Sequence, residues 1–374
     1  MPYNRLKIAY FIDRLICGGT ELQLVEQINQ LAKKRVEQEL FCLYKSAEHD
    51  SIPVSCKVNI LNIRKLISAN CLRAIYSLVI YLRANKFSLA QTYFFDSTVI
   101  GILAARMAGG IKTISCRRDL GFWHTPALLF ILKMIDKITD RILVNAEVVK
   151  QSVIEKERLS PQRIDVIPNG LTTSQFKYSE EEKKQNRAEF GIKIDDVCVG
   201  TVANMSRKVK RVDVFVSAAQ LVLQRTQNVK FLILGEGALR DELVQMARQL
   251  RIETNLVFLR SNISKHKVLS AMDIGISTSD SEGFSNAIME YMAAGLPVVA
   301  TAVGGNKDLL KNNEMGFLVK PGDFQVLAER ILELISDKTK RSAFGERGRE
   351  FIMPFDWKNI TEMTYKYYED QLRP

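Results

Sequence analysis

The sequence predicts an α/β protein made of two doubly wound, Rossmann-like domains, each built on a parallel sheet. Short runs rich in β-branched residues alternate with helical patterns along the chain, which is typical of βαβ units. The alternation stops once, in a polar stretch near the middle, and then starts again. A length of 374 residues also exceeds what one hydrophobic core usually organises, so we expect two domains.

The first domain is predicted from seven strand-like runs and the helical patterns between them. The helices are recognised by apolar residues that recur at three- and four-residue spacings and so share one face. The predicted strands are Lys7–Asp13, Leu40–Tyr44, Val58–Ile63, Leu89–Phe94, Lys112–Cys116, Arg141–Val144 and Asp165–Ile167. The predicted helices include Glu21–Lys34, Leu72–Ala84 and Val99–Ala108.

The second domain follows a polar stretch, from Thr172 to Glu189, which indicates a linker with a short helix. The predicted strands are Val197–Ala203, Lys230–Leu234, Leu256–Leu259, Ile274–Ser277 and Val298–Ala300, and the helices are Val212–Gln224, Leu239–Gln249, Asn286–Ala294 and Gln325–Ile335. We therefore expect a first domain at 1–172, a linker at 173–190, a second domain at 191–352, and a C-terminal helix at 353–374 that crosses back to the first domain.

The composition argues against several classes of protein. Apolar residues make up 47% and charged residues 25%, which is ordinary for a globular chain and argues against disorder. No uninterrupted apolar window approaches the length of a transmembrane helix. The six cysteines are irregularly spaced and form no C-x-x-C, so neither a zinc site nor a disulfide framework is predicted. We expect a cytoplasmic protein with reduced thiols.

The net charge of +11 belongs almost entirely to the first half of the chain. Residues 1–175 carry 24 Lys and Arg against 15 Asp and Glu, a net charge of +9. Between Asp50 and Asp96 there is no acidic residue, and six basic residues lie there among Leu, Ile, Tyr and Val. This profile suits an anionic membrane surface, where each basic residue contributes about 1 kcal/mol, and it equally suits a solvated helix face. Nucleic acid is not expected, because no aromatic and basic recognition motif accompanies the charge.

The most specific segment is SEGFSNAIME, in which Glu282 and Glu290 bracket seven residues. A helix is predicted to begin near Ser285. Its first backbone N–H groups and the positive end of its dipole would point at a ligand, which suits a diphosphate. Glu290 lies further into the helix and can accept hydrogen bonds from the vicinal hydroxyls of a ribose.

This segment, with the Gly-Leu-Pro-Val-Val-Ala-Thr strand and the Gly304-Gly305 turn after it, resembles the large retaining glycosyltransferase family 4, also called the group 1 glycosyltransferases. The resemblance runs nearly end to end. It implies the GT-B fold, in which two Rossmann-like domains face each other across a cleft that holds a sugar nucleotide. It also implies that Glu282 lies by the donor sugar and that Glu290 holds the ribose.

The resemblance extends to the loop from Val202 to Asp213, which in the family places basic side chains on the donor diphosphate. Fixed cations there stabilise the negative charge that builds up on the leaving phosphate. The implied catalytic residues are Glu282, Lys210 and Arg207. The implied donor-binding residues are Gly18 and Gly19 of an N-terminal glycine loop, Asn204, Lys210, Gly283, Phe284, Ser285, Asn286 and Glu290. For the two N-terminal glycines, a plain strand-to-helix turn is the alternative.

The acceptor-side candidates follow two strands of the first domain. Asp96 stands near the place where many relatives carry a histidine, which this chain lacks. Arg117, Arg118, Asp119 and His124 follow the fifth strand and are expected at the rim of the cleft, where arginines can bind a sugar or a phosphate. A structural ion-pair network is the alternative. No base is assigned to His124, because in the family the leaving phosphate can accept the proton.

Other enzyme classes are less favoured. No Gly-Lys-Ser/Thr motif of a P-loop occurs, and the Gly235 turn lacks the third glycine of a dinucleotide fingerprint. No metal-binding cluster is visible, and we expect neither a metal nor a cofactor.

The predicted function is retaining transfer of a hexosyl unit from a UDP-sugar, or less favourably a GDP-sugar, to a saccharide or lipid-linked acceptor in the synthesis of a surface polysaccharide or glycolipid. The alternatives are a sugar-nucleotide epimerase of the same fold and a non-catalytic, basic membrane-binding protein. The expected location is the cytoplasm, with a peripheral position on the inner face of the cell membrane if the basic segment binds lipid.

Overall fold

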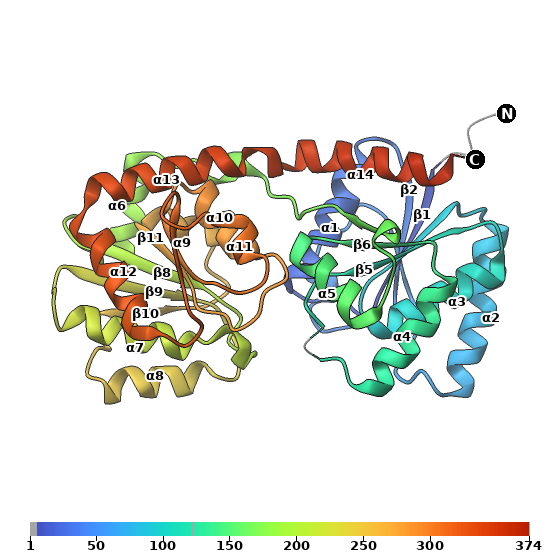
Figure 1. Ribbon diagram of the computed structural model, residues 1–374, viewed down its shortest axis with the longest axis horizontal. Coiled ribbons are helices and arrows are strands. Elements are labelled where there is room, and N and C mark those ends of the chain that lie inside the picture. The colour runs from blue at the N-terminus through green and yellow to red at the C-terminus, as the bar shows by residue number, and fades with distance from the viewer. Residues whose placement is uncertain (1–5, 122, 374) are drawn as a thin grey trace. The chain divides into compact units, whose positions relative to one another are not determined.

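The chain forms two compact units (Figure 1). The structure is a computed structural model that describes residues 6–121 and 123–373. Unit 1 runs to Gly170 and resumes at Trp357, and unit 2 comprises Leu171–Asp356. Each unit is a parallel sheet with helices packed on it, so the predicted fold class, two Rossmann-like α/β domains, is confirmed.

Within the described residues, the sheet of unit 1 has seven parallel strands in the order β3-β2-β1-β4-β5-β6-β7. The strands are β1 (Lys7–Ile12), β2 (Glu37–Cys42), β3 (Lys57–Ile60), β4 (Leu89–Thr92), β5 (Lys112–Arg117), β6 (Arg141–Val144) and β7 (Ile164–Val166). Because β1 pairs with β2 on one side and with β4 on the other, the strand order reverses at β1. In open parallel sheets, the carboxyl ends of the strands at such a point line a crevice that binds ligands.

The two faces of this sheet have separate hydrophobic cores, because successive side chains of a strand point to opposite faces. Ile8 and Tyr10 of β1 pack with helices α1 and α14, whereas Ala9 and Phe11 pack with α2 and α3. The helices of unit 1 are α1 (Gly19–Ala32), α2 (Ala69–Ala84), α3 (Phe95–Ala108), α4 (Pro126–Ile138), α5 (Glu147–Glu157) and α14 (Trp357–Leu372).

Helix α14 is the C-terminal helix, and its side chains complete the core of unit 1. The fully buried Tyr368 hydroxyl accepts a hydrogen bond from Gln27 Nε2 at 2.7 Å and donates one to Gln91 Oε1 at 2.6 Å. At Gly170, a Cβ atom would lie 2.5 Å from the Trp357 ring, so only glycine lets these two ends of unit 1 meet. The helix begins later than the predicted residue 353, because a 3₁₀ turn at Met353–Phe355 precedes it.

Within its described residues, unit 2 has six parallel strands in the order β10-β9-β8-β11-β12-β13, so the order reverses at β8. The strands are β8 (Val197–Val202), β9 (Val229–Leu234), β10 (Leu256–Leu259), β11 (Ile274–Ser277), β12 (Val298–Thr301) and β13 (Gly316–Val319). The helices are α6 (Glu180–Glu189), α7 (Val212–Leu223), α8 (Arg240–Gln249), α9 (Lys265–Ala271), α10 (Asn286–Ala293), α11 (Asn306–Leu309), α12 (Phe324–Ser336) and α13 (Lys338–Ile352).

The stretch that the sequence predicts as a linker belongs to unit 2. Helix α6 begins with a capping box in which Ser179 and Glu182 exchange hydrogen bonds. The buried Arg187 then joins α6 to the β11 side of the sheet through a 2.8 Å ion pair with Asp273. The helix is held largely by polar contacts, which explains its polar sequence.

Helices that could span a bilayer are absent from the part of the chain that the structure describes: each is too short or too polar.

Candidate active site

The reversal of strand order in unit 2 brings two loops together at the carboxyl ends of β8 and β11. One loop carries Lys210, in the short 3₁₀ turn Lys208–Lys210, and the other carries Glu282. The loops are joined by two hydrogen bonds to backbone carbonyls: the Thr278 hydroxyl donates to the Lys210 carbonyl at 3.0 Å, and the Asp280 N–H donates to the Val209 carbonyl at 2.8 Å. The position of Lys210 beside Glu282 is therefore fixed by the fold.

Lys210 and Glu282 form an ion pair. The Lys210 ammonium donates to Oε1 of Glu282 at 2.6 Å, and the Ser279 hydroxyl donates to the same oxygen at 2.6 Å. The Glu282 side chain is 12% exposed and that of Lys210 is 28% exposed. A half-buried lysine held in this way presents a fixed positive charge at a sheet edge, which is the arrangement that an anionic leaving group requires.

The N-terminus of helix α10 lies directly after Glu282. The Ser285 hydroxyl caps the helix by accepting a hydrogen bond from the Ile288 N–H at 3.4 Å, and Phe284 and Ser285 are buried. The Gly305 N–H donates to the Glu282 carbonyl at 3.3 Å, and a Cβ atom at Gly305 would lie 2.1 Å from the Gly283 carbonyl oxygen. The Gly304-Gly305 turn therefore supports the backbone at the start of α10, where the helix dipole favours an anion.

Glu290 lies further along α10 and is 14% exposed. Its carboxylate accepts a hydrogen bond from the Lys265 ammonium, at the start of α9, at 2.6 Å. Burial raises the pKa of the neighbouring Tyr291 hydroxyl, and the charges of Glu290 and Glu282 raise that pKa further. The Tyr291 hydroxyl accepts a hydrogen bond from the Val202 N–H, at the end of β8, at 2.7 Å. The sequence did not indicate a role for Lys265, because a lysine on a short helix belongs to no recognisable motif.

The loop after β8 is shaped by its own side chains and by two glycines. The Asn204 side chain accepts a hydrogen bond from the Ser206 N–H at 2.8 Å, while Arg207 is exposed. A Cβ atom at Gly235 would lie 2.0 Å from the Ala203 carbonyl oxygen, and one at Gly237 would lie 2.0 Å from the Ser206 nitrogen. These glycines let the loop after β9 pack against the Lys210 loop.

In unit 1, Gly18 and Gly19 lie where β1 leads into α1. Gly18 is the N-cap of α1, and its N–H donates to the Ile16 carbonyl at 2.8 Å. A Cβ atom at Gly18 would lie 2.3 Å from a carboxylate oxygen of the buried Glu21. The structure thus explains a small residue at Gly18 by local packing at a helix N-terminus.

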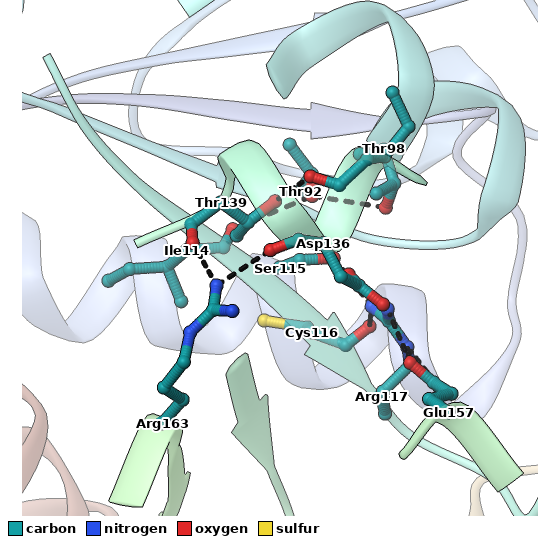
Figure 2. Close-up of polar contacts among 11 residues, drawn as sticks. Thr92, Thr98, Ile114, Ser115, Cys116, Arg117, Asp136, Thr139, Glu157 and Arg163 are labelled. Carbon is teal, nitrogen blue, oxygen red and sulfur yellow. Dashed lines mark hydrogen bonds and ion pairs between the residues drawn. The ribbon is translucent and has the colours of Figure 1, made fainter. Parts of the chain in front are cut away.

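Arg117 was expected at the rim of a cleft, but its side chain is only 8% exposed. Its guanidinium takes part in a buried ion-pair network (Figure 2). Its guanidinium lies 2.8 Å from Oδ1 of Asp136 and 2.9 Å from Oε2 of Glu157. Burial raises the pKa of Asp136. Burial acts in the same direction on Glu157, but the charge and hydrogen bonds of Arg117 outweigh it and leave the pKa of Glu157 lowered. Arg117 is therefore part of a structural ion-pair network, the alternative to binding an acceptor, and it joins β5 to α4 and α5.

A pocket in unit 1 is lined by all four predicted residues that follow the fifth strand, Arg117, Arg118, Asp119 and His124, together with Thr20, Phe95 and Lys156. Arg118 donates to Asn169 Oδ1 at 3.1 Å, and its buried Nε atom has no partner among the described residues. Asp119 shapes the loop by accepting hydrogen bonds from the Gly121 N–H at 2.7 Å and from the Trp123 indole at 3.0 Å.

His124 and Asp96 complete the set of predicted acceptor-side residues. Both ring nitrogens of His124 are buried without a partner in the described residues, and burial lowers its pKa, which favours the neutral imidazole. The carboxyl of Asp96, in the first turn of α3, is half-buried, and burial raises its pKa.

The described residues contain no group of three or more His, Cys, Asp or Glu side chains arranged to hold a metal ion.

Two family models match the chain: "Glycosyl transferases group 1" over residues 182–351, and "Glycosyltransferase Family 4" over residues 17–175. The UDP-Gal:alpha-D-GlcNAc-diphosphoundecaprenol alpha-1,3-galactosyltransferase of Escherichia coli is 22% identical over 354 residues, which are 90% of this chain and 89% of that protein. The N-acetyl-alpha-D-glucosaminyl L-malate synthase of Bacillus anthracis is 29% identical over 198 residues, and this match spans 52% of the chain and 51% of that protein.

Solved structures of similar proteins share the fold over nearly the whole chain. Anabaena HepE, solved in complex with UDP, superimposes with a TM-score of 0.83 at 22% identity, and the match covers 98% of this chain and all of that one. A glycosyltransferase of Rickettsia africae gives a TM-score of 0.88 at 16% identity, with 99% of this chain and 100% of that chain covered.

Proposed function

Because the chain belongs to the group 1 glycosyltransferases of family 4, we propose that it transfers a hexosyl unit from a nucleotide-diphosphate sugar to a saccharide or lipid-linked acceptor, with retention of the anomeric configuration. The observation that carries the proposal is the Lys210–Glu282 ion pair at the N-terminus of α10, with Glu290 on the same helix. This set combines a fixed cation, a helix dipole and a hydroxyl-binding carboxylate, and together these features can bind a ribose and a diphosphate.

In this proposal the parts of the donor bind different parts of α10 and its neighbours. The ribose hydroxyls donate to Glu290, whose carboxylate is held by Lys265. The diphosphate lies at the helix N-terminus, near the backbone of Gly283 to Asn286, and the Lys210 ammonium approaches the β-phosphate. Arg207, which is exposed at the same loop, contributes a second cation. As the bond to the sugar breaks, negative charge grows on the β-phosphate and these cations stabilise the transition state more than the bound donor.

Retention follows, in the proposal, from a displacement on the face of the sugar that the diphosphate leaves. The departing phosphate accepts the proton of the acceptor hydroxyl, so no side-chain base is needed. Glu282 lies beside the sugar and positions Lys210. The neutral His124 is not assigned the role of base. No metal or other cofactor takes part in these steps.

The donor is proposed to be a UDP-sugar rather than a GDP-sugar. The supporting observations come from similar proteins: Anabaena HepE was solved with UDP and with UDP-glucose, and the E. coli relative is named for a UDP-Gal donor. The acceptor is proposed to be carried on a polyprenyl diphosphate in the synthesis of a surface polysaccharide or glycolipid. The E. coli relative and a Campylobacter jejuni relative, 22% identical over 381 residues, are both named for diphosphoundecaprenol-linked acceptors. Such an acceptor places the enzyme at the inner face of the cell membrane.

The acceptor is proposed to bind the unit 1 pocket. Arg118, with an unpartnered buried Nε atom, and Lys156 supply cationic groups, and the Trp123 ring offers an apolar face for a sugar. Asp119 and Asp96 are proposed as polar contacts of the acceptor, and Arg117 supports the floor of this pocket from within the protein.

The proposal is tested by incubating the purified chain with a panel of UDP- and GDP-hexoses and a short-chain polyprenyl-diphosphate sugar. We expect one UDP-hexose to be transferred, and we expect Glu290→Ala to reduce transfer while Glu329→Ala, an exposed glutamate of α12, leaves it unchanged. The proposal is wrong if no donor is used and Glu290→Ala binds UDP as the wild type does. Conversion of the donor to another sugar nucleotide without any acceptor would instead favour an epimerase.

A further inference from the structure

Exposed apolar side chains are concentrated on one surface of unit 1. Twelve large apolar side chains are exposed among the described residues, and eight of them lie on or next to helices α2, α3 and α4. These helices are neighbours: α2 packs on α3 and α3 packs on α4, on the sheet face opposite to α1 and α14 (Figure 1). We call the solvent-facing side of α2, α3 and α4 the α2–α4 face. A concentration of this kind marks an interaction surface.

Helix α2 has apolar residues on two sides. Cys71, Leu78 and Leu82 are buried against the sheet, as the core requires. On the opposite side, Leu72, Tyr76 and Ile80 are 71%, 67% and 52% exposed. Their spacing of four residues places them in one stripe along the helix. Ile67, just before the helix, is 98% exposed and extends this apolar surface.

Helix α4 repeats the arrangement. Leu132 and Ile135 are buried, whereas Phe130 and Met134, one turn apart, are 65% and 46% exposed. Ile131, beside Phe130, is 40% exposed. The core accounts for the buried sides of both helices and gives no reason for the apolar residues on their outer sides.

Basic side chains predominate among the charges of the α2–α4 face, since the half-buried Asp96 lies in the first turn of α3 and Asp140, after α4, is paired with Arg106. The sequence has no acidic residue between Asp50 and Asp96, and the only acidic residue of α4, Asp136, is fully buried in the Arg117 network. Basic side chains lie in the loop before α2, within α2 and after it: Arg64, Lys65, Arg73 and Lys86 are exposed. At the end of α4, Lys137 is exposed as well.

This chemistry fits a lipid surface better than the other candidate partners. A second copy of the chain would oppose one positive surface to another, which is unfavourable. Nucleic acid would match the charge, but it gives no burial to Leu72, Ile80 or Met134. Helices that combine exposed aliphatic and aromatic residues with Lys and Arg bind at the interface of an anionic bilayer, where apolar side chains enter the headgroup region and basic ones meet lipid phosphates. Tyr76 has the amphipathic ring that is enriched at that depth.

The geometry points to the α2–α4 face as the site at which the enzyme docks on an anionic phospholipid bilayer. The inference rests on the proposed function, since a polyprenyl-linked acceptor lies in such a bilayer. Docking through this face concentrates the enzyme on the surface that holds its acceptor.

The test is a flotation assay of the full chain with vesicles of phosphatidylglycerol and phosphatidylcholine, and with vesicles of phosphatidylcholine alone. We expect binding to the anionic vesicles that weakens with added salt, and roughly tenfold weaker binding to the neutral ones. The apolar variant is Leu72→Ser/Tyr76→Ser/Ile80→Ser, and its matched control is Leu22→Ser/Ile194→Ser/Met363→Ser, which changes exposed apolar residues elsewhere. The apolar variant should bind about tenfold more weakly than the wild type, and the control should bind like the wild type.

Two charge-reversed double variants distinguish binding through this face from an effect of the net charge of the whole chain. Lys65→Glu/Arg73→Glu should lose binding to anionic vesicles, whereas Lys33→Glu/Lys177→Glu, which changes two exposed lysines that do not belong to α2, α3 or α4, should retain it. The inference is overturned if the wild type binds neither kind of vesicle, if it binds both kinds equally, or if each control variant loses as much vesicle binding as the variant to which it is matched. Self-association of the wild type that the apolar variant abolishes would also overturn it, in favour of a dimer surface.

The same variants are assayed for transfer to a water-soluble, short-chain acceptor without vesicles, where all should match the wild type. A chain that binds vesicles through this face but transfers no sugar would contradict the proposed function and leave the docking surface standing. A chain that transfers sugar but binds no vesicle would contradict the docking surface and leave the proposed function standing.

Discussion

The Nζ atom of Lys265 and the Oε1 atom of Glu290 lie 2.6 Å apart and connect the first turn of α9 to the middle of α10. Glu290 is the carboxylate proposed to bind the ribose. A carboxylate held in place before the ligand arrives loses less conformational freedom on binding, so the ion pair is expected to favour affinity. Lys265 is thus a positioning residue that acts through Glu290.

Glu290→Ala removes the proposed acceptor of the ribose hydroxyls and should weaken UDP binding by about 10- to 100-fold, the range expected for hydrogen bonds to a charged group. Lys265→Met keeps the carboxylate but releases it, so the loss should be smaller, about threefold to tenfold. Calorimetric titration with UDP and with 2′-deoxy-UDP checks both values. If Lys265→Met discriminates between the two nucleotides as strongly as the wild type does, Lys265 does not position Glu290.

Lys210→Met should lower kcat for sugar transfer by about 10²- to 10³-fold, because the lysine stabilises charge that develops only as the phosphate leaves. The affinity for UDP-sugar should change much less. Steady-state kinetics with the donor varied separates the two effects, and Lys208→Met, an exposed lysine on the same turn, serves as the control. Equal losses in the two variants would place the catalytic cation elsewhere.

Arg117→Met should destabilise the fold by about 3–5 kcal/mol, because it leaves the buried carboxyls of Asp136 and Glu157 without their cation. Arg106→Met breaks a more exposed ion pair with Asp140, at 3.3 Å, and should cost less than about 1 kcal/mol. Urea unfolding of the two variants gives the comparison. Similar midpoints for both variants would mean that the Arg117 network contributes no more than a surface pair.

Gly305→Ala should lower turnover by about tenfold and stability by about 1–3 kcal/mol. The added methyl group would press on the Gly283 carbonyl, at 2.1 Å, and displace the backbone that leads into α10. Gly348→Ala, in helix α13, is the matched control, because its methyl group would meet the Met292 side chain of α10 at an ordinary 3.5 Å. An unimpaired Gly305→Ala enzyme would show that the Gly304-Gly305 turn does not support the site.

Asp13 should make stability depend on pH. Its carboxyl accepts a hydrogen bond from the Ser97 N–H at 3.0 Å, near the start of α3, and burial raises its pKa from 3.8 to about 6. Between these values the folded protein binds the proton more tightly than the unfolded chain does, so the free energy of unfolding falls as pH rises from roughly 4 to about 6.

Asp13→Asn retains the hydrogen-bond acceptor and removes the titration. Relative to this variant, the wild type should lose on the order of 2 kcal/mol across that window, since one pKa unit corresponds to about 1.4 kcal/mol. Urea midpoints at several pH values measure the difference. Parallel stability curves for the two proteins would rule out a titrating Asp13.

The proximity of Lys210 and Glu282 could be expected from the sequence, because each follows a predicted strand of the same parallel sheet, and the carboxyl ends of parallel strands lie at one edge. The strand runs were equally accessible, since most are apolar and bounded by turn residues. The strand β13 was not predicted: its four residues begin with Gly316, and glycine is depleted in strands. The polar sequence of α6 concealed a packed helix, since its contacts with the sheet are ion pairs rather than apolar ones.

The positions of Arg117 and Lys265 could not be predicted for a different reason. An arginine at a strand end points either to the rim of a crevice or into the protein, and the choice depends on Asp136 and Glu157, 19 and 40 residues away. Lys265 meets Glu290 only because α9 packs near α10. Partners brought together by tertiary packing leave no periodic signal in the sequence of either element.

A crystal structure of the chain with UDP is the decisive experiment for the donor site. We expect the ribose hydroxyls within hydrogen-bonding distance of Glu290, and the β-phosphate at the N-terminus of α10 beside Lys210. UDP bound in a place that touches neither Glu290 nor Lys210 would contradict the assignment of the donor site.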